Sequence, residues 1–157
     1  MSDTALASRL DELTVLIVDD NAALRGALRV SLQAFGCGRV VEADTVDRAL
    51  DTLAARPVDI IVTDWKMKPR DGLDFVRTLR RPGADGTALV PVIMLSAYSD
   101  EGRITAAYQA GVSAFLVKPF TAASLARVLK DTLDRETRAQ TDTPIRTGAP
   151  SRYASAS

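Results

Sequence analysis

The sequence contains no histidine and only one cysteine, Cys37, among its 157 residues. A single cysteine cannot form an intrachain disulfide, and the usual zinc sites combine Cys and His ligands. A disulfide-stabilised fold and a Cys/His zinc site are therefore excluded. We interpret Cys37 as a small apolar residue near a turn.

The sequence also lacks an excess of charge of either sign and any long apolar run. Lys+Arg and Asp+Glu number 20 each, so no global basic field attracts nucleic acid or an anionic membrane. No stretch reaches the roughly 18 apolar residues of a membrane span, and the opening MSDTALASRLDEL carries acids, unlike a signal peptide. We therefore expect a cytoplasmic protein.

Five short apolar runs rich in β-branched residues alternate with segments of helical spacing. The runs are Thr14–Val18, Arg39–Ala43, Asp59–Thr63, Pro91–Leu95 and Ala114–Val117. Strands that alternate with helices predict an α/β fold with a parallel sheet and helices on both faces. We predict a (βα)₅ doubly wound parallel sheet of the flavodoxin-like type, with strand order 2-1-3-4-5.

The flanks of this unit have a different composition. We assign residues 1–12 to an N-terminal lead-in, residues 13–137 to the domain, and residues 138–157 to a disordered tail. The tail is rich in Ser, Thr, Ala and Pro and has no apolar periodicity. No second domain fits, so we expect no DNA-binding domain.

Polar residues stand where the predicted strands end. Asp19 and Asp20 follow the first strand, Asp64 follows the third, Ser96 the fourth and Lys118 the fifth. In a parallel sheet these ends share one edge, so the fold predicts that the five side chains converge. Taken alone, Asp19 and Asp20 are equally interpretable as a helix cap.

Three clustered carboxylates repel one another and favour a bound hard cation. Oxygen ligands suit Mg²⁺, which often binds one or two carboxylates together with phosphate oxygens. With an ammonium group and a hydroxyl beside them, the carboxylates provide the charge stabilisation that phosphoryl transfer requires. Carboxylate attack that gives an aspartyl phosphate is a known form of covalent catalysis.

At this point the sequence resembles the response-regulator receiver family over roughly residues 13–135. The resemblance is carried by the order and spacing of five motifs: VLIVDDN at 15–21, IVTDWKM at 61–67, DG at 71–72, VIMLSA at 92–97 and AGVSAFLVKPF at 110–120. Each motif alone is weak, but together they stand at the expected places of the predicted topology.

The resemblance implies a role for each site residue. Asp64 would be the phosphoacceptor, and Mg²⁺ would be held by Asp64, by Asp20, by Asp19 mainly through water, and by the backbone carbonyl of Lys66. The phosphoryl group would be bound by Ser96 and Lys118, with Phe115 as the aromatic switch that changes rotamer with Ser96. Phe115 is equally interpretable as a fixed core aromatic. Pro119 would follow a cis peptide bond.

Two positions lead to a further hypothesis. Lys66 and Tyr98 stand two residues beyond the phosphoacceptor and the hydroxyl, where family side chains flank the path of attacking water. A long cation and an aromatic ring there could shield the aspartyl phosphate, which predicts a long-lived phosphorylated state. Lys68 also stands where the family often has proline, and Pro69 follows it.

The leading hypothesis is a phosphorylation-switched module of a two-component system. Because the sequence has no histidine, the phosphohistidine donor must be a sensor histidine kinase or phosphotransfer protein. Phosphorylation would shift the face made by the fourth helix, fifth strand and fifth helix, and so control a partner or a phosphorelay. The residues expected to be exposed on that face are Arg103, Tyr108, Arg127 and Lys130.

Two alternatives remain at this stage. One is a pseudo-receiver that acts only by binding, although all five residues of the predicted site are present. The other is a metal-dependent hydrolase with an aspartyl-phosphate intermediate. Such enzymes usually place a second acid two residues after the nucleophile, and this position holds Lys66. We therefore expect no enzymatic activity beyond self-phosphorylation and autodephosphorylation.

Overall fold

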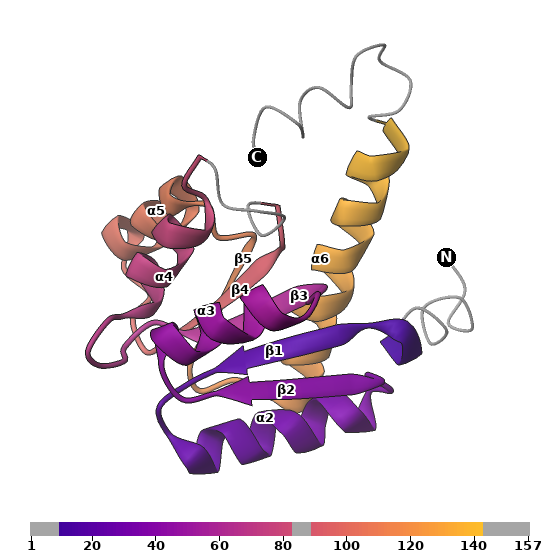
Figure 1. The fold of residues 1–157 in the computed structure, drawn as a ribbon. Helices are drawn as coiled ribbons and strands as arrows, with labels where there is room; N and C mark the ends of the chain where they lie inside the picture. The colour runs from indigo at the N-terminus through magenta and orange to yellow at the C-terminus, as the bar shows by residue number, and fades with distance from the viewer. Residues whose placement is uncertain (1–9, 83–88, 143–157) are drawn as a thin grey trace.

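The computed structural model describes residues 10–82 and 89–142. Strands and helices alternate along this part of the chain (Figure 1). Their order is β1 (Thr14–Val18), α2 (Ala22–Ala34), β2 (Arg39–Ala43), α3 (Val46–Ala55), β3 (Ile60–Asp64), α4 (Gly72–Leu79), β4 (Val92–Ser96), α5 (Glu101–Ala110), β5 (Ala114–Val117) and α6 (Ala122–Asp142).

The five strands form one parallel sheet in the order β2-β1-β3-β4-β5, so the predicted fold class and strand order are confirmed. β3 and β4 each lie one residue later than expected, because Asp64 and Ser96 still pair with the neighbouring strand. Asp64 is opposite Leu95, and Ser96 is opposite Val117. Two residues of the predicted site are thus held in register by the sheet itself.

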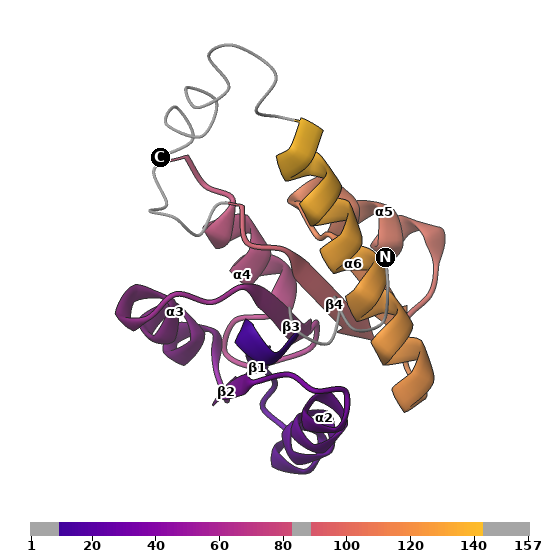
Figure 2. The ribbon, with the colours of Figure 1, turned by 90° about the vertical axis from the view of Figure 1, so that its right-hand side faces the viewer.

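Alternate residues of the strands face two separate apolar layers. In β1, Val15 and Ile17 pack with the buried leucines of α2 and α6, whereas Leu16 and Val18 pack with α3, α4 and α5 (Figures 1 and 2). β1, β3 and β4 are buried along their whole length, as expected for central parallel strands. The largest fully buried side chain, Phe75, alone contributes about 1.5–3 kcal/mol through burial.

Polar side chains begin the helices that leave the carboxyl edge of the sheet. Asn21 caps α2, Thr45 caps α3, Asp71 caps α4 and Asp100 caps α5, each by accepting a backbone N–H of the first turn. The loops at this edge therefore give these four helices a fixed start. The site residues are placed between these caps and the strand ends.

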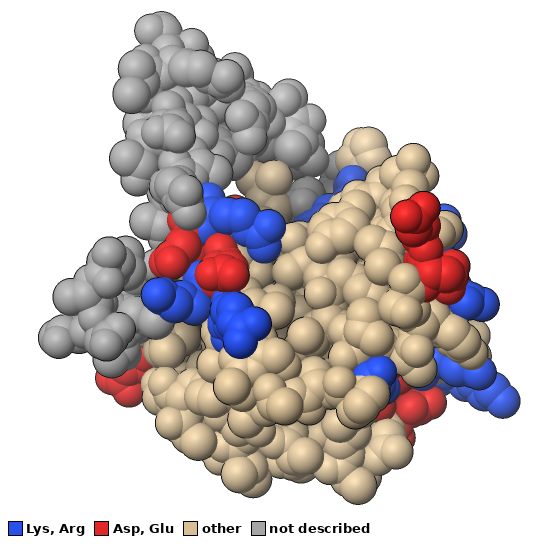
Figure 3. All heavy atoms as spheres, turned by 180° about the vertical axis from the view of Figure 1, so that it is seen from behind, with Lys and Arg blue, Asp and Glu red and all other residues tan. Residues whose placement is uncertain are grey.

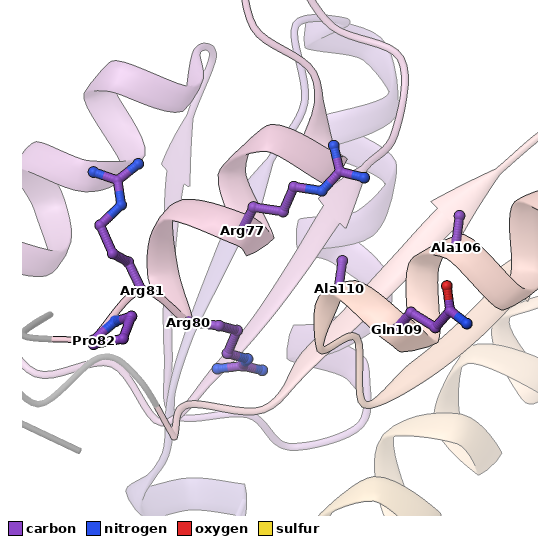
Figure 4. Close-up of a pocket in the computed structure, with 7 residues that line it drawn as sticks. All are labelled: Arg77, Arg80, Arg81, Pro82, Ala106, Gln109 and Ala110. Carbon is purple, nitrogen blue, oxygen red and sulfur yellow. The ribbon is translucent and has the colours of Figure 1, made fainter. Parts of the chain in front are cut away.

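Arg80 joins the end of α4 to the end of α5 (Figure 4). Its guanidinium donates to the carbonyl of Gly111 from Nε at 3.1 Å and Nη2 at 2.9 Å, and to the carbonyl of Val90 from Nη1 at 2.7 Å. Burial lowers the pKa of the Arg80 guanidinium. Arg80 also lines a surface hollow of about 540 Å³ together with Arg77 and Arg81. Arg81 points away from Arg80, so the arginine side chains do not converge there (Figure 4).

The last helix extends past the expected domain boundary at residue 137. α6 runs to Asp142, so residues 138–142, which we had assigned to a disordered tail, continue the helix. Residues 143–157 of the expected tail and residues 1–9 of the expected lead-in lie outside the described residues, and residues 10–12 are helical. No helix within the described ranges combines the length and the apolar character that a membrane crossing needs.

Candidate functional site

The five strand-end residues of the sequence analysis lie around one cavity of about 560 Å³ at the carboxyl edge of the sheet. Loops that follow four different strands build its wall. The cavity is lined by Asp19, Asp20, Asn21, Leu24, Asp64, Trp65, Lys66, Met67, Lys68, Ser96, Ala97, Tyr98 and Lys118. The convergence expected from a parallel sheet is therefore present in the structure.

Three carboxylates meet on one side of this cavity. Asp19, Asp20 and Asp64 each offer an oxygen, and these oxygens lie within 4.8 Å of one another. Asp19 and Asp64 are buried, whereas Asp20 is exposed. Burial raises the pKa of Asp19, and the charges of Asp64 and Asp20 raise it further.

Asp19 is only half satisfied by the protein. Its Oδ1 accepts the backbone N–H of Asn21 at 2.8 Å, a bond that lowers its pKa. Its Oδ2 is buried and has no hydrogen-bond partner within the described part of the chain. A buried carboxylate oxygen without a partner is costly, so this position is suited to an external ligand.

Lys118 balances one of the three charges. Its Nζ lies 2.7 Å from Asp64 Oδ1, and the side chains are 28% and 9% exposed. The backbone N–H of Lys118 donates to the carbonyl of Ser96 at 2.8 Å, which holds the start of this loop against β4. The Lys118–Pro119 peptide bond is cis, the geometry that the resemblance implies.

Ser96 brings a buried hydroxyl to the same cavity. Its residue is 1% exposed, and its Oγ accepts the backbone N–H of Tyr98 at 3.0 Å. A serine hydroxyl can accept and donate at the same time, so its hydrogen stays available for another acceptor. The loop after β4 therefore positions the Ser96 hydroxyl and leaves its hydrogen available for donation.

The loop after β3 folds back onto Asp64. The N–H of Gly72 donates to the carbonyl of Trp65 at 2.7 Å, and a Cβ on Gly72 would lie 2.2 Å from the carbonyl oxygen of Asp64. Only glycine fits this approach. The DG pair at 71–72 is one of the motifs of the sequence analysis, but no role was predicted for Gly72. A close approach of two backbone segments leaves no sequence signal other than the glycine itself.

The two aromatic residues near the site touch each other. The Trp65 and Phe115 rings meet edge to face, with centroids 6.2 Å apart and planes at 80°. Phe115 is half-buried, packs on the core layer of α3, α4 and α5, and is not among the cavity-lining residues. The structure thus brings Trp65 into the cavity wall and places Phe115 behind it.

Lys66 and Tyr98 stand at the cavity mouth. Lys66 is exposed, and Tyr98 is 40% exposed. The guanidinium of Arg103 lies over the Tyr98 ring, 3.9 Å from its centroid, and Arg103 also pairs with Asp100 at 2.9 Å. Sequence reasoning placed Arg103 on a partner face and missed this contact, since stacking between a loop and a helix has no spacing signature.

The donor set fits a hard divalent cation. Three carboxylates offer oxygens within 4.8 Å, and the unpartnered Oδ2 of Asp19 is the kind of oxygen that such a cation satisfies. The lining contains no histidine or cysteine, and its side-chain nitrogen and sulfur atoms belong to Asn21, Trp65, Met67 and the lysines, which are not the usual ligands of zinc. This composition favours Mg²⁺ over zinc or copper.

Comparison with known proteins adds independent information. The sequence model of the protein family described as the response regulator receiver domain matches residues 15–130. The chain is 40% identical over 131 residues to the KDP operon transcriptional regulatory protein KdpE of Escherichia coli, a match that covers 83% of this chain and 56% of the relative. It is 35% identical over 123 residues to the chemotaxis protein CheY-3 of Vibrio cholerae, covering 78% and 93%.

Solved structures agree with this match. The chemotaxis protein CheY4 of Vibrio cholerae aligns with a TM-score of 0.70 and 26% identity, covering 76% of this chain and 98% of that one. A response regulator receiver protein of Pseudomonas putida aligns with a TM-score of 0.68 and 32% identity, covering 76% and 96%. Both alignments span nearly the whole of the compared proteins.

Proposed function

Because the chain belongs to the receiver domain family of two-component response regulators, a family of signalling modules, we propose that it is a switch phosphorylated on Asp64. One observation carries the proposal. The Asp64 carboxylate lies 2.7 Å from the Lys118 ammonium, within a cluster of three carboxylates and beside a buried hydroxyl. The phosphoryl donor is the phosphohistidine of a sensor kinase or phosphotransfer protein, since the chain has no histidine of its own.

The side chains divide the chemistry among them. A carboxylate oxygen of Asp64 attacks the phosphorus and forms the P–O bond, while the P–N bond breaks and its electron pair leaves with the imidazole of the donor. Lys118 pairs with one phosphoryl oxygen as a point charge. Ser96 donates its hydroxyl hydrogen to another, because the N–H of Tyr98 already occupies the accepting side of Oγ.

Asp19, Asp20 and Asp64 are the residues that would hold Mg²⁺, with Asp19 acting mainly through water and the backbone carbonyl of Lys66 as a further ligand. When bound, the cation neutralises charge on the phosphoryl group and on the crowded carboxylates. The raised pKa of Asp19 and its unpartnered oxygen support a site built for such a charge.

The switch would act on the face formed by α5, β5 and α6. Ser96 is linked to the loop before α5 through Tyr98, whose ring lies under Arg103, so movement of Ser96 would be transmitted to that helix. Phe115 would respond through its edge contact with Trp65. The remaining residues assigned to the face, Tyr108, Arg127 and Lys130, are all exposed.

The surface supports a protein partner for this switch. Seen from behind, Lys and Arg side chains lie beside Asp and Glu on two sides of the molecule, and a broad uncharged area lies between them (Figure 3). A partner on this side would be recognised mainly through shape and uncharged contacts. The outcome of phosphorylation is then control of a partner protein or transfer along a phosphorelay.

The lifetime of the phosphorylated state is the finer part of the proposal. Lys66 and Tyr98 stand at the cavity mouth, where attacking water must pass. We expect the double variant Lys66→Asn/Tyr98→Glu to lose its acyl phosphate faster than the wild type. Decay at the wild-type rate would remove this part of the proposal without touching Asp64.

The test is incubation of the purified chain with Mg²⁺ and acetyl phosphate, read by intact mass, or with beryllofluoride, read by Trp65 fluorescence. We expect a response in the wild type that is absent in Asp64→Asn. No response in the wild type would favour a binding-only pseudo-receiver. Sustained turnover of small phosphomonoesters would favour a hydrolase.

A further inference from the structure

Arg25, Arg29 and Glu42 form an ion cluster beside the site but outside the cavity lining. Arg25 Nε lies 3.0 Å from Glu42 Oε1, and Arg29 Nε lies 2.5 Å from Glu42 Oε2. The arginines come from successive turns of α2 and the glutamate from β2. Both arginines lower the pKa of Glu42, so the carboxylate stays ionised between them.

Only one of these arginines reaches the acid pair. Arg25 Nη1 donates to the backbone carbonyl of Asp19 at 2.8 Å, whereas Arg29 makes no hydrogen bond to it among the described residues. That carbonyl belongs to the peptide unit between Asp19 and Asp20. This peptide unit connects the two acids, so holding its carbonyl restrains the backbone from which both side chains leave.

The contact is not explained by helix capping or by charge. Asn21 already caps α2, and the N–H of Asp19 is bonded to the carbonyl of Ala43. The Arg25 guanidinium meets the backbone carbonyl of Asp19, and no ion pair joins it to either carboxylate among the described residues. Arg25 therefore acts on the acid pair through the backbone.

The second contact of Arg25 explains why it is held in place. A long side chain on a helix surface samples many rotamers, and ordering one costs entropy. Arg25 is 18% exposed and Glu42 is 27% exposed, so their pair is partly shielded from water. Glu42 thus orients the guanidinium of Arg25 through Nε, and Nη1 then points at the Asp19 carbonyl.

We infer that Arg25, oriented by Glu42, is a positioning residue that sets the Mg²⁺ affinity of the Asp19–Asp20 pair. The inference rests on the Mg²⁺ site of the proposed function. Groups that orient metal ligands typically change metal affinity by about 10–100-fold when they are removed. Arg25 and Glu42 therefore support the metal site from outside the cavity, whereas Arg29 contacts only Glu42.

The experiment is a Mg²⁺ titration of the full chain followed by the fluorescence of Trp65, the only tryptophan. Arg25→Met is expected to bind Mg²⁺ about tenfold more weakly than the wild type. Arg25→Lys, whose single ammonium cannot bridge Glu42 and the carbonyl in the same way, is expected to fall between them. Thermal unfolding in EDTA measures the stability of each variant separately.

Arg29→Met is the matched control, because it removes the other arginine of Glu42 and leaves the Asp19 contact in place. Its Mg²⁺ affinity is expected to stay close to that of the wild type. Equal affinities for Arg25→Met and Arg29→Met would overturn the inference. If Arg25→Met does not fold, Glu42→Gln serves in its place, with a smaller expected loss and wild-type affinity as the contrary result. A wild type that does not respond to Mg²⁺ overturns the proposed metal site and this inference together.

Discussion

Asp59 and Asp19 lie at opposite ends of the same sheet and are treated differently by the structure. At the amino end, Asp59 Oδ2 accepts the backbone N–H of Thr14 at 2.8 Å and ties the start of β3 to the start of β1. At the carboxyl end, Asp19 is buried beside two further carboxylates and keeps one oxygen without a partner.

The difference distinguishes a carboxylate that stabilises the fold from one that destabilises it. A carboxylate that accepts a backbone N–H at an exposed position stabilises the fold by a modest amount. A buried carboxylate among like charges destabilises it, and is retained where a ligand or a reaction needs it. The amino end of this sheet is therefore structural, and the carboxyl end is the one to which we assign the proposed chemistry.

The largest expected effect is on phosphorylation, which a substitution at the carboxyl end should abolish and one at the amino end should leave unchanged. Asp64→Asn should abolish phosphoryl incorporation from acetyl phosphate, because the nucleophilic oxygen is replaced by an amide. Asp59→Asn, at the amino end, should incorporate phosphate as the wild type does. Intact mass spectrometry measures both. Phosphorylation that persists in Asp64→Asn would place the acceptor elsewhere.

Two glycines test the same contrast through packing. A Cβ on Gly72 would lie 2.2 Å from the Asp64 carbonyl oxygen, and one on Gly38 would lie 1.8 Å from the Asp11 carbonyl oxygen. Each change to alanine should reduce the free energy of unfolding by about 3 kcal/mol, measured in urea. Only Gly72→Ala should also weaken Mg²⁺ binding, because its clash displaces the Asp64 backbone.

Gly26 provides the control for these two variants. A Cβ there meets nothing within 4 Å, so Gly26→Ala should stabilise α2 by about 0.5–1 kcal/mol. Loss of Mg²⁺ affinity in Gly38→Ala equal to that in Gly72→Ala would show that the two ends are not independent.

Asp19→Asn should raise the stability of the metal-free protein by about 1.5 kcal/mol, since it removes a buried charge with an unpartnered oxygen. The pKa of Asp19 is raised in the folded state, so the folded state holds its proton more tightly than the unfolded state. The wild type should therefore lose stability in EDTA as the pH rises from about 4 through the raised pKa.

The measurement is urea unfolding of both proteins across this pH range in EDTA. The gap between them should open as the pH rises and then remain constant. Added Mg²⁺ should stabilise the wild type and have little effect on Asp19→Asn. A gap that is constant from acid to neutral pH would contradict the assigned cause.

The smallest expected loss of stability is that of Asp59→Ala, which removes one bond to the N–H of Thr14. Its loss should reduce the free energy of unfolding by about 1 kcal/mol, with Mg²⁺ affinity unchanged. Chemical denaturation and a Mg²⁺ titration test the two halves of this statement. A change in Mg²⁺ affinity would break the proposed division between the ends.

The sequence was most informative where one residue type dominates a short segment. β-branched runs predicted all five strands to within one residue, and the parallel order then required Asp64 and Lys118 to meet. The pattern was least informative for contacts between distant polar groups. The pair of Arg25 with Glu42 spans 17 positions and two elements, so no periodicity reveals it.

The end of α6 was missed for a different reason. Residues 138–142 have no apolar stripe, and the tail composition pointed to disorder. They include Ala, Arg and Gln, however, which favour helix without any packing. Intrinsic helical propensity is therefore enough to account for the extension of α6 to Asp142.

The separation of the apolar strand bodies from the polar strand ends has an evolutionary consequence. Val62 and Ile93 are fully buried parts of the core, while Asp64 and Lys118 extend beyond it into the cavity. A descendant of this gene could therefore lose Asp64, the proposed phosphoacceptor, in one step and still encode a folded protein. In this architecture the residues that specify the fold and the residues of the proposed phosphorylation site can therefore evolve separately.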